Sequence, residues 1–185
     1  MFTDDFKTED AEKICKKLNI KLYIKDYRKE FKKQIIDRFI DDYKNGLTPN
    51  PCVLCNKTVK IKYLLDAMYE YKADYIATGH YARIVDGKLF KSKNLNKDQS
   101  YFLSQLTKEA VNRLLFPLEN LEKNEVRNIA NKHNLDNSEK KDSFDVCFIT
   151  SSFQEYMSNN TKPTPGNIIN INTNEIIGKH NGLMY

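Results

Sequence analysis

The sequence has no apolar run that approaches the ~18 residues of a membrane-spanning helix. Its first ten residues, MFTDDFKTED, lack the basic and then apolar pattern of a secretory signal. Internal repeats are absent as well. These absences predict a cytoplasmic protein with no membrane partner.

Histidine and cysteine are scarce, with three and four residues among 185. In a reducing compartment, four cysteines indicate a metal site or catalysis more than a disulfide framework. The net charge of +5 is compatible with a polyanionic partner, although surface lysines that only solvate the protein give a similar balance. Hydrophobic residues make up 40% of the chain, which is enough for the core of one domain, or of one domain and part of another.

Residue periodicity predicts the elements of the first third of the chain. A helix is expected from Thr8, with Cys15 on its apolar stripe as a small core residue, and the alternation in residues 20–26 predicts a strand. The next helix should end near Gly46 and bury residues at four-residue steps: Phe31, Ile35, Phe39 and Tyr43. Residues 48–57, TPNPCVLCNK, are expected to form a loop before a helix with the inner face Ile61, Leu64, Leu65 and Met68.

The middle of the chain alternates strands with helices. Residues 75–77 predict a short strand that ends in Thr78-Gly79-His80, and Asp86-Gly87 is typical of a hairpin turn. Helical stretches are expected at residues 100–106 and 107–116. Another is expected at 123–135, with Val126, Ile129 and Ala130 facing inward. This order predicts an α/β layered fold with a parallel sheet.

From Ser151 the composition changes. Residues 151–160 predict a short helix, and two isoleucine-rich segments around Asn172-Thr173-Asn174 predict a β-hairpin. A hairpin without partner strands is marginal in water, so this part is expected to open a separate β-rich unit that is cut off at Tyr185.

Three cysteines carry the clearest chemical signal. Cys52 and Cys55 form a C-x-x-C pair, and Cys147 follows the cationic stretch 140–143, KKDS, which would lower a thiol pKa. A structural zinc site needs four ligands, and no second C-x-x-C or suitably spaced histidine supplies the fourth. Three thiolates could hold an iron–sulfur cluster with one open iron, two could form a transient disulfide, or the pair could be unrelated small residues in a loop.

Two further segments have polar residues where ligands bind. Gly79 follows a strand and would let a ligand approach the backbone closely, with His80 beside it as a hydrogen-bonding group, although a simple turn has the same pattern. Lys97 could contact a phosphate. Asp98 and Gln99 could contact a base edge or hold a loop.

Taken in order, these motifs resemble the tRNA-specific 2-thiouridylase family, often called MnmA. The segments that carry the resemblance are TPNPCVLCNK, ADYIATGHYAR, NKDQSYFL, LFPLENLEKNEVRNIA, KKDSFDVCFI and PGNIININTNEIIGKHNGLMY. The resemblance implies a partial PP-loop ATP-pyrophosphatase domain, an adenine nucleotide alpha hydrolase-like α/β fold of Rossmann type, over residues 1–150. Residues 151–185 would begin a small, β-containing, tRNA-contacting domain.

The family's activity is ATP-dependent transfer of persulfide sulfur to C2 of the wobble uridine of tRNA. By motif position, Cys147 resembles the persulfide-bearing cysteine, and Cys55 the nucleophile that forms a disulfide with it. Gly79 matches the ATP-contacting glycine. The positions that match tRNA contacts are Asn50, Pro51, Cys52, His80, Lys97, Asp98 and Gln99. The resemblance also implies ATP with Mg²⁺ as cofactor, and a cysteine desulfurase or relay protein as the persulfide donor.

Two departures from the family pattern matter. The ATP-binding SGG-x-DS loop is not in this sequence, which implies a fragment or truncated gene product without that loop and without the C-terminal β-barrel. Such a chain would bind ATP poorly and have little activity by itself. Cys52 stands where many members have aspartate, which raises the iron–sulfur reading of Cys52, Cys55 and Cys147. The alternatives are therefore a non-catalytic tRNA-binding remnant or an iron–sulfur cluster-binding module.

Overall fold

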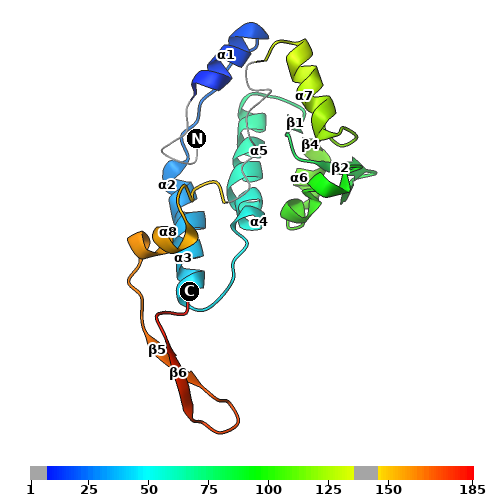
Figure 1. Ribbon diagram of the computed structural model, residues 1–185. Coiled ribbons are helices and arrows are strands. Elements are labelled where there is room, and N and C mark those ends of the chain that lie inside the picture. Colours follow the sequence, from blue (N-terminus) through cyan, green and yellow to red (C-terminus); the bar gives the residue numbers. More distant parts are fainter. Residues whose placement is uncertain (1–7, 136–145) are drawn as a thin grey trace.

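The computed structural model describes residues 8–135 and 146–185. These residues form helices and three small two-stranded sheets (Figure 1). The chain begins with α1, Glu9–Lys17, which starts after Thr8 as predicted. Cys15 lies on its half-buried side, and α1 has no fully buried residue. The expected core position of Cys15 is therefore only partly met, because this helix packs at the edge of the molecule (Figure 1).

Residues 20–26 do not form the predicted strand. Ile20, Leu22 and Ile24 are all exposed, and no described strand pairs with this segment. Alternating side chains define a strand only where a neighbouring strand supplies backbone hydrogen bonds. The segment is instead held beside the end of α5, Ile61–Glu70, by stacking of Tyr23 on Tyr71, with ring centroids 4.1 Å apart.

The second predicted helix is confirmed. It runs without a break through α2, Arg28–Phe31, the π-helical turn η1, Lys32–Ile36, and α3, Asp37–Lys44. The apolar residues at four-residue steps, Phe31, Ile35 and Phe39, are buried. Gly46 ends the helix as expected, with a left-handed φ of 73° that glycine adopts without strain.

The predicted loop at 48–57 is wrong from Pro51 onward. Residues of α4, Pro51–Cys55, the π-helical η2, Asn56–Lys60, and α5, Ile61–Glu70, form one continuous helix. Asn50 caps its start, because its side-chain oxygen accepts a hydrogen bond from the Val53 amide at 3.2 Å. Pro51 takes the first helical position, where its missing N–H costs nothing.

A short parallel strand pair forms the sheet predicted for the α/β layer. β1, Ile76–Ala77, pairs in parallel with β4, Leu114–Leu115. The helix predicted over 107–116 is therefore shorter than expected: α6 covers only Lys108–Arg113, and Leu114 turns to extended backbone. The 100–106 stretch forms only a 3-10 turn, η4, Ser100–Leu103.

The two predicted hairpins are confirmed. β2, Ala82–Val85, and β3, Lys88–Lys91, join through Asp86 and Gly87, which both have positive φ. A second 3-10 turn, η3, Leu95–Lys97, follows β3. The other hairpin comprises β5, Gly166–Ile169, and β6, Ile176–His180, and extends away from the helices (Figure 1).

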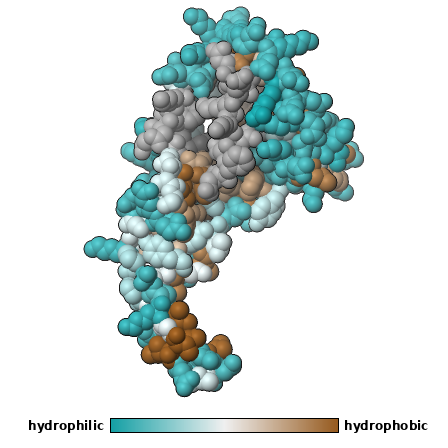
Figure 2. Space-filling model, viewed as in Figure 1, coloured by the Kyte–Doolittle hydropathy of each residue, from teal (hydrophilic) through white to brown (hydrophobic). Residues whose placement is uncertain are grey.

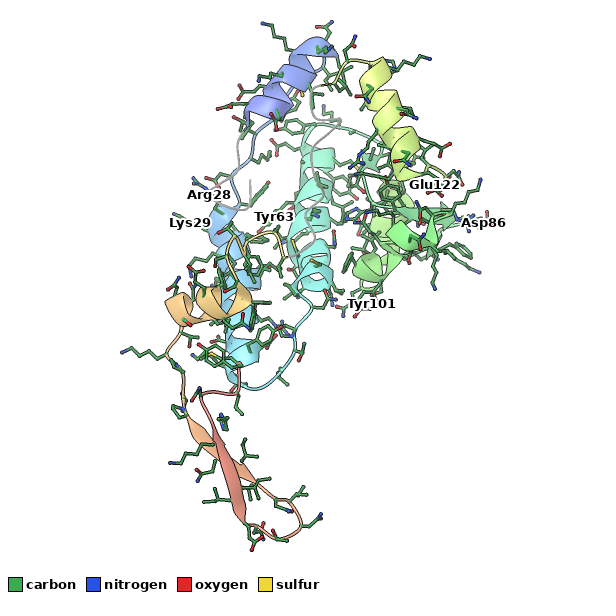
Figure 3. The ribbon with its side chains drawn as sticks, in the orientation of Figure 1. Arg28, Lys29, Tyr63, Asp86, Tyr101 and Glu122 are labelled. Atoms are coloured by element: carbon green, nitrogen blue, oxygen red, sulfur yellow. The ribbon has the colours of Figure 1, made fainter. Side chains whose placement is uncertain are left out.

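Two apolar cores lie on either side of the central helix. The first core surrounds Ile61 and Met68 of α5 with residues of the β1–β4 pair, the β2–β3 hairpin and α6. The second core joins Val59 of η2 to the aromatic residues of α2–α3 and to α8, Phe153–Asn160. Tyr63 points from α5 toward α2 (Figure 3), where its ring stacks on Tyr27 at 4.0 Å. The central helix thus presents one side to each core.

Some inner faces were predicted less well. Leu64 of α5 is 37% exposed, and Ile129 of α7, Lys123–Lys132, is 47% exposed, although both were expected to face inward. The isoleucines of the β5–β6 hairpin are exposed too, and apolar surface gathers on that hairpin in Figure 2. The division of the chain at residue 150 stays a prediction. None of the helices in the two described ranges combines the length and apolar character needed to cross a membrane.

Candidate functional site

Three cysteines from distant parts of the sequence meet beside the start of the central helix. Cys52 and Cys55 are three residues apart on α4, and this spacing puts them on the same face of the helix. Cys147 follows from the far end of the chain and is close enough to act electrostatically on both. All three are free thiols; Cys52 and Cys55 are half-buried and Cys147 is exposed.

Phe148 holds Cys147 in place. Its ring inserts into the second core, 5.9 Å from the Phe31 ring and 5.2 Å from the Phe39 ring, both in edge-to-face geometry. The ring of Tyr156 from α8 lies 5.7 Å away on another side. The segment after residue 145 is therefore anchored by an aromatic side chain directly next to the thiol.

Desolvation raises the pKa of each thiol, although Cys147 is exposed at the surface. It raises the pKa of Cys55 to about 11, and it raises the pKa of Cys52 and of Cys147. Lys60 opposes this effect at each thiol. The cationic stretch 140–143, which was expected to favour a thiolate at Cys147, lies outside the described residues, and in the described part desolvation outweighs the one cation.

His80 lies after β1 and is neutral at physiological pH. Its pKa is lowered to about 4, first by burial and then by the charge of Lys60. Nδ1 lies 2.8 Å from the Thr78 hydroxyl, and the Phe116 ring packs edge-on against the imidazole. A neutral imidazole can hydrogen-bond a base or a sugar hydroxyl, but it adds no charge for a phosphate.

Gly79, between these two residues, is exposed at the carboxyl end of β1. A Cβ built there would meet only Leu118 Cδ1, at an ordinary contact distance of 3.9 Å. The protein itself therefore does not require glycine at this position. The space in front of the backbone is open to a ligand that approaches closely, as in other α/β sheets.

The side chains of Asp98 and Gln99 hold their own loop. Asp98 accepts hydrogen bonds from the Ser92 amide and the Ser100 hydroxyl, both at 2.7 Å. Gln99 Oε1 accepts from the amide of Tyr81 at 3.1 Å, next to His80. The loop-holding interpretation of these two residues is what the structure shows, and their contacts with tRNA, like that of Lys97, stay predictions.

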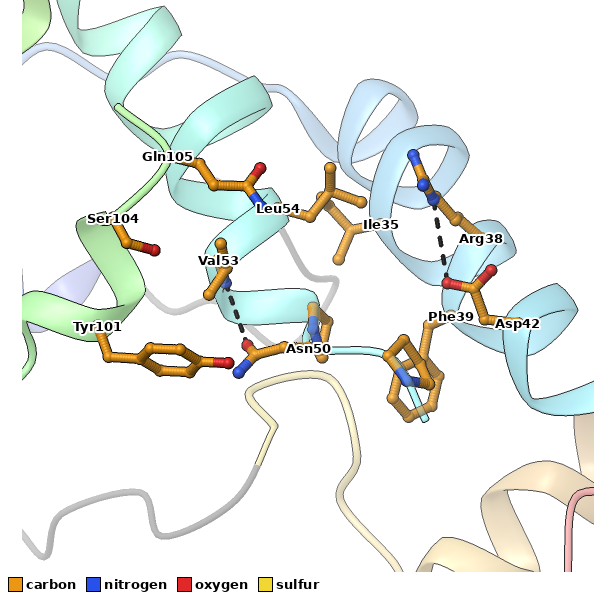
Figure 4. A pocket seen from close by; sticks show the side chains of 12 residues that line it. Ile35, Arg38, Phe39, Asp42, Asn50, Val53, Leu54, Tyr101, Ser104 and Gln105 are labelled. Carbon is orange, nitrogen blue, oxygen red and sulfur yellow. Dashed lines mark hydrogen bonds and ion pairs between the residues drawn. The ribbon is translucent and has the colours of Figure 1, made fainter. Parts of the chain in front are cut away.

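A cavity of about 280 Å³ opens beside the start of α4 (Figure 4). Asn50 and Pro51 form part of its wall, while Tyr101, which is 64% exposed, faces it from η4. The remaining polar wall residues, which the motif analysis missed, are Arg38, Asp42, Ser104 and Gln105. Arg38 and Asp42 form an ion pair at 3.9 Å across one side. For this part of the cavity wall, the sequence contained one signal, the aromatic residue Tyr101 two positions after Gln99.

A metal centre has no ligand set here. Among residues 8–135 and 146–185, no group of three or more histidine, cysteine or acidic side chains is arranged to hold a metal ion. Cys52, Cys55 and Cys147 are included in that statement. The arrangement is instead that of three thiols with raised pKa values near one cation, with a neutral histidine nearby.

Comparison with known proteins identifies the family of the chain. Residues 2–151 match the family described as the tRNA methyl transferase HUP domain. The chain belongs to this family. The expected α/β fold of the PP-loop and Rossmann type is thereby confirmed, and the parallel β1–β4 pair with flanking helices is the part of it that the described residues show.

Several relatives extend the match beyond that domain. The tRNA-specific 2-thiouridylase MnmA of Mycoplasmopsis synoviae is 46% identical over 179 residues, which cover 96% of this chain and 48% of the relative. The same enzyme of Mycoplasma mobile is 43% identical over 179 residues, and that of Mesomycoplasma hyopneumoniae 46% over 178, again covering 48% of each relative. The chain spans about half the length of the curated relatives it matches.

Proposed function

We propose that the protein takes part in the 2-thiolation of a tRNA uridine, with Cys147 as the persulfide-bearing cysteine and Cys55 as its partner nucleophile. The observation that supports this most directly is the convergence of thiols that are 92 positions apart (147 − 55) at one point of the fold. An aromatic anchor next to Cys147 makes the convergence a built feature. The names of the relatives supply the substrate class.

The two thiols can complete the sulfur balance of this reaction. The terminal sulfur of a Cys147 persulfide would attack C2 of an adenylated uridine, with AMP as the leaving group. The Cys55 thiolate would then attack Sγ of Cys147 and break the sulfur–sulfur bond, so that the transferred sulfur stays on C2. The products are 2-thiouridine and a Cys55–Cys147 disulfide, which an external thiol reduces.

The exposure of Cys147 fits the delivery of sulfur from outside. A persulfide donor, either a cysteine desulfurase or a relay protein, must reach this thiol, and Cys147 is the most exposed of the three. Once attached, the sulfur would lie next to the half-buried Cys55.

ATP would be used at the carboxyl end of β1. Gly79 leaves room for a nucleotide against the backbone, and ATP with Mg²⁺ would supply the adenylate that makes the uridine oxygen a leaving group. The cavity beside Asn50 and Pro51 lies on the side of α4 that Val53 and Leu54 line, and it could accept a nucleotide of a single-stranded loop, with Tyr101 as a stacking surface.

The proposal is tested in cells that carry the gene with a chromosomal Cys147→Ser change. Nucleosides from their total tRNA should contain no 2-thiouridine, while the purified variant should bind tRNA as the unchanged protein does. Cys15→Ser is the matched control and should leave 2-thiouridine unchanged, because Cys15 lies on α1, away from this site. Persistence of 2-thiouridine in the Cys147→Ser strain would refute the role of Cys147.

No observation favours a second function. The cluster-binding reading lacks a ligand set among the described residues. The reading as a tRNA-binding remnant predicts no need for a pair of converging thiols. It would be supported if Cys147→Ser cells retained 2-thiouridine while the protein still bound tRNA.

A further inference from the structure

Lys60 closes the π-helical turn that begins directly after Cys55, and the sequence motifs did not include it. It is the last residue of η2 and is half-buried. Its charge acts on all three thiols and on His80. Within the described ranges, no carboxylate forms an ion pair with Lys60, whereas Lys25, Lys32 and Lys44 each have one.

The π-helical turn explains how Lys60 reaches the thiols. In a regular α-helix of 3.6 residues per turn, residue i+5 lies about 140° around the axis from residue i. In a π-helical turn the backbone bond runs from i to i+5, so the two residues stack on the same side. Cys55 precedes η2 and Lys60 closes it, which makes them such a pair. The backbone N–H of Lys60 also favours the thiolate of Cys55.

The neighbours of Lys60 in this site carry no charge of their own. Cys52 and Cys55 face it from α4, Cys147 from the anchored segment and His80 from the end of β1. Burial raises the pKa of the half-buried Cys52 and Cys55 and keeps the imidazole neutral at physiological pH. A half-buried cation without a counter-ion is costly, and an anion that appears at this point gains from it.

We propose that Lys60 is a positioning residue of the thiol site, whose charge stabilises the sulfur anion on Cys55 and on a Cys147 persulfide. This inference rests on the proposed function for its meaning in tRNA thiolation. It also makes a claim about thiol chemistry that stands without tRNA. The anion that Lys60 would stabilise is a thiolate or a persulfide anion, because the charge of Lys60 lowers the pKa of each of the three cysteines.

The test compares Lys60→Met with Lys60→Arg and with the control Lys57→Met. Lys57 is an exposed cation of the same η2 turn whose ammonium donates to Gln105 Oε1 at 3.3 Å, and it does not act on the thiols. Each purified chain is alkylated with iodoacetamide between about pH 7 and about pH 11, and peptide mass spectrometry reports the rate at each cysteine separately.

Lys60→Met should slow the alkylation of Cys55 at pH 8 by about three- to tenfold, because each pKa unit changes the thiolate fraction about tenfold. The midpoint of the Cys55 pH–rate profile should move to higher pH. Lys60→Arg and Lys57→Met should stay within about twofold of the unchanged chain. Alkylation of Cys15 should not change in any variant, which shows that the fold is kept.

A second readout does not depend on sulfur. Lys60 lowers the pKa of His80, so Lys60→Met should raise the His80 midpoint in an NMR titration, and Lys60→Arg should not. Unchanged Cys55 and His80 profiles in a folded Lys60→Met chain would overturn the inference. Loss of 2-thiouridine in Cys147→Ser cells with unchanged Lys60→Met profiles would leave the proposed function standing and sink only the role of Lys60.

Discussion

Phe148→Ala should release Cys147 from its partner. Phe148 is 9% exposed, and its ring makes edge-to-face or tilted contacts with three aromatic rings, those of Phe31, Phe39 and Tyr156. Truncation of a buried phenylalanine costs about 3–5 kcal/mol. The segment around Phe148 has no regular secondary structure, so much of this loss should fall on the docking of the segment.

The expected effect on the thiol pair follows from that figure. If about 3 kcal/mol is lost from docking, the equilibrium constant for docking falls by about 100-fold, since about 1.4 kcal/mol corresponds to a factor of ten. The effective concentration of the Cys55–Cys147 pair should fall by about 10- to 100-fold, because part of the loss is shared with the rest of the second core.

The assay is equilibration of the pair in glutathione redox buffers, with Cys15 and Cys52 replaced by serine. Urea unfolding of the same chains separates the loss of docking from the loss of global stability. Phe90→Ala, on the exposed face of β3, is the control and should leave the effective concentration unchanged. If Phe148→Ala forms the Cys55–Cys147 disulfide as readily as the parent, another contact must position Cys147.

Two further predictions concern stability. In the folded protein the pKa of His80 is about 4, against 6.5 ordinarily. Between these two pH values the unfolded chain therefore binds more protons than the folded protein. Acidification from pH 6.5 to about 4 should lower the free energy of unfolding by about 1–3 kcal/mol. Urea titrations should show a smaller loss over this window in His80→Gln. Asn50→Ala should lower the free energy of unfolding by about 1 kcal/mol through loss of the cap on Val53, whereas Asn50→Asp should keep it. Equal stability of the alanine and aspartate variants would show that the cap contributes nothing.

The sequence predicted the elements that local signals define. The hairpin at Asp86-Gly87 forms because both residues adopt positive φ, and the helix with Phe31, Ile35 and Phe39 forms because its apolar stripe faces a core. The error at residues 51–57 was avoidable. Asn50-Pro51 is a start signal for a helix, but the two prolines and the cysteines were interpreted as a turn.

Other features depend on contacts that no local pattern contains. Residues 20–26 alternate as a strand does, yet strand formation requires a partner strand, and none of the described strands lies beside them. The meeting of Cys55 with Cys147 results from the packing of Phe148 between α3 and α8. The functional pairing of those two residues rests on the family resemblance and stays a prediction, whereas residue spacing alone left a metal clip, a disulfide and a bare loop as alternatives.

In the proposed function, Lys60 would favour a sulfur anion at a site where Cys55 is otherwise protonated. Burial raises the pKa of Cys55 to about 11, so at neutral pH only about one Cys55 in 10,000 is a thiolate. A persulfide ionises at lower pH than its parent thiol, so sulfur on Cys147 would place an anion near Lys60, for which the described residues show no ion pair. The half-buried Cys52 and Cys55 stay protonated at neutral pH, and a thiol is less easily oxidised than a thiolate. In this proposal burial keeps Cys55 protonated in the empty site, and Lys60 would favour the sulfur anion once it forms.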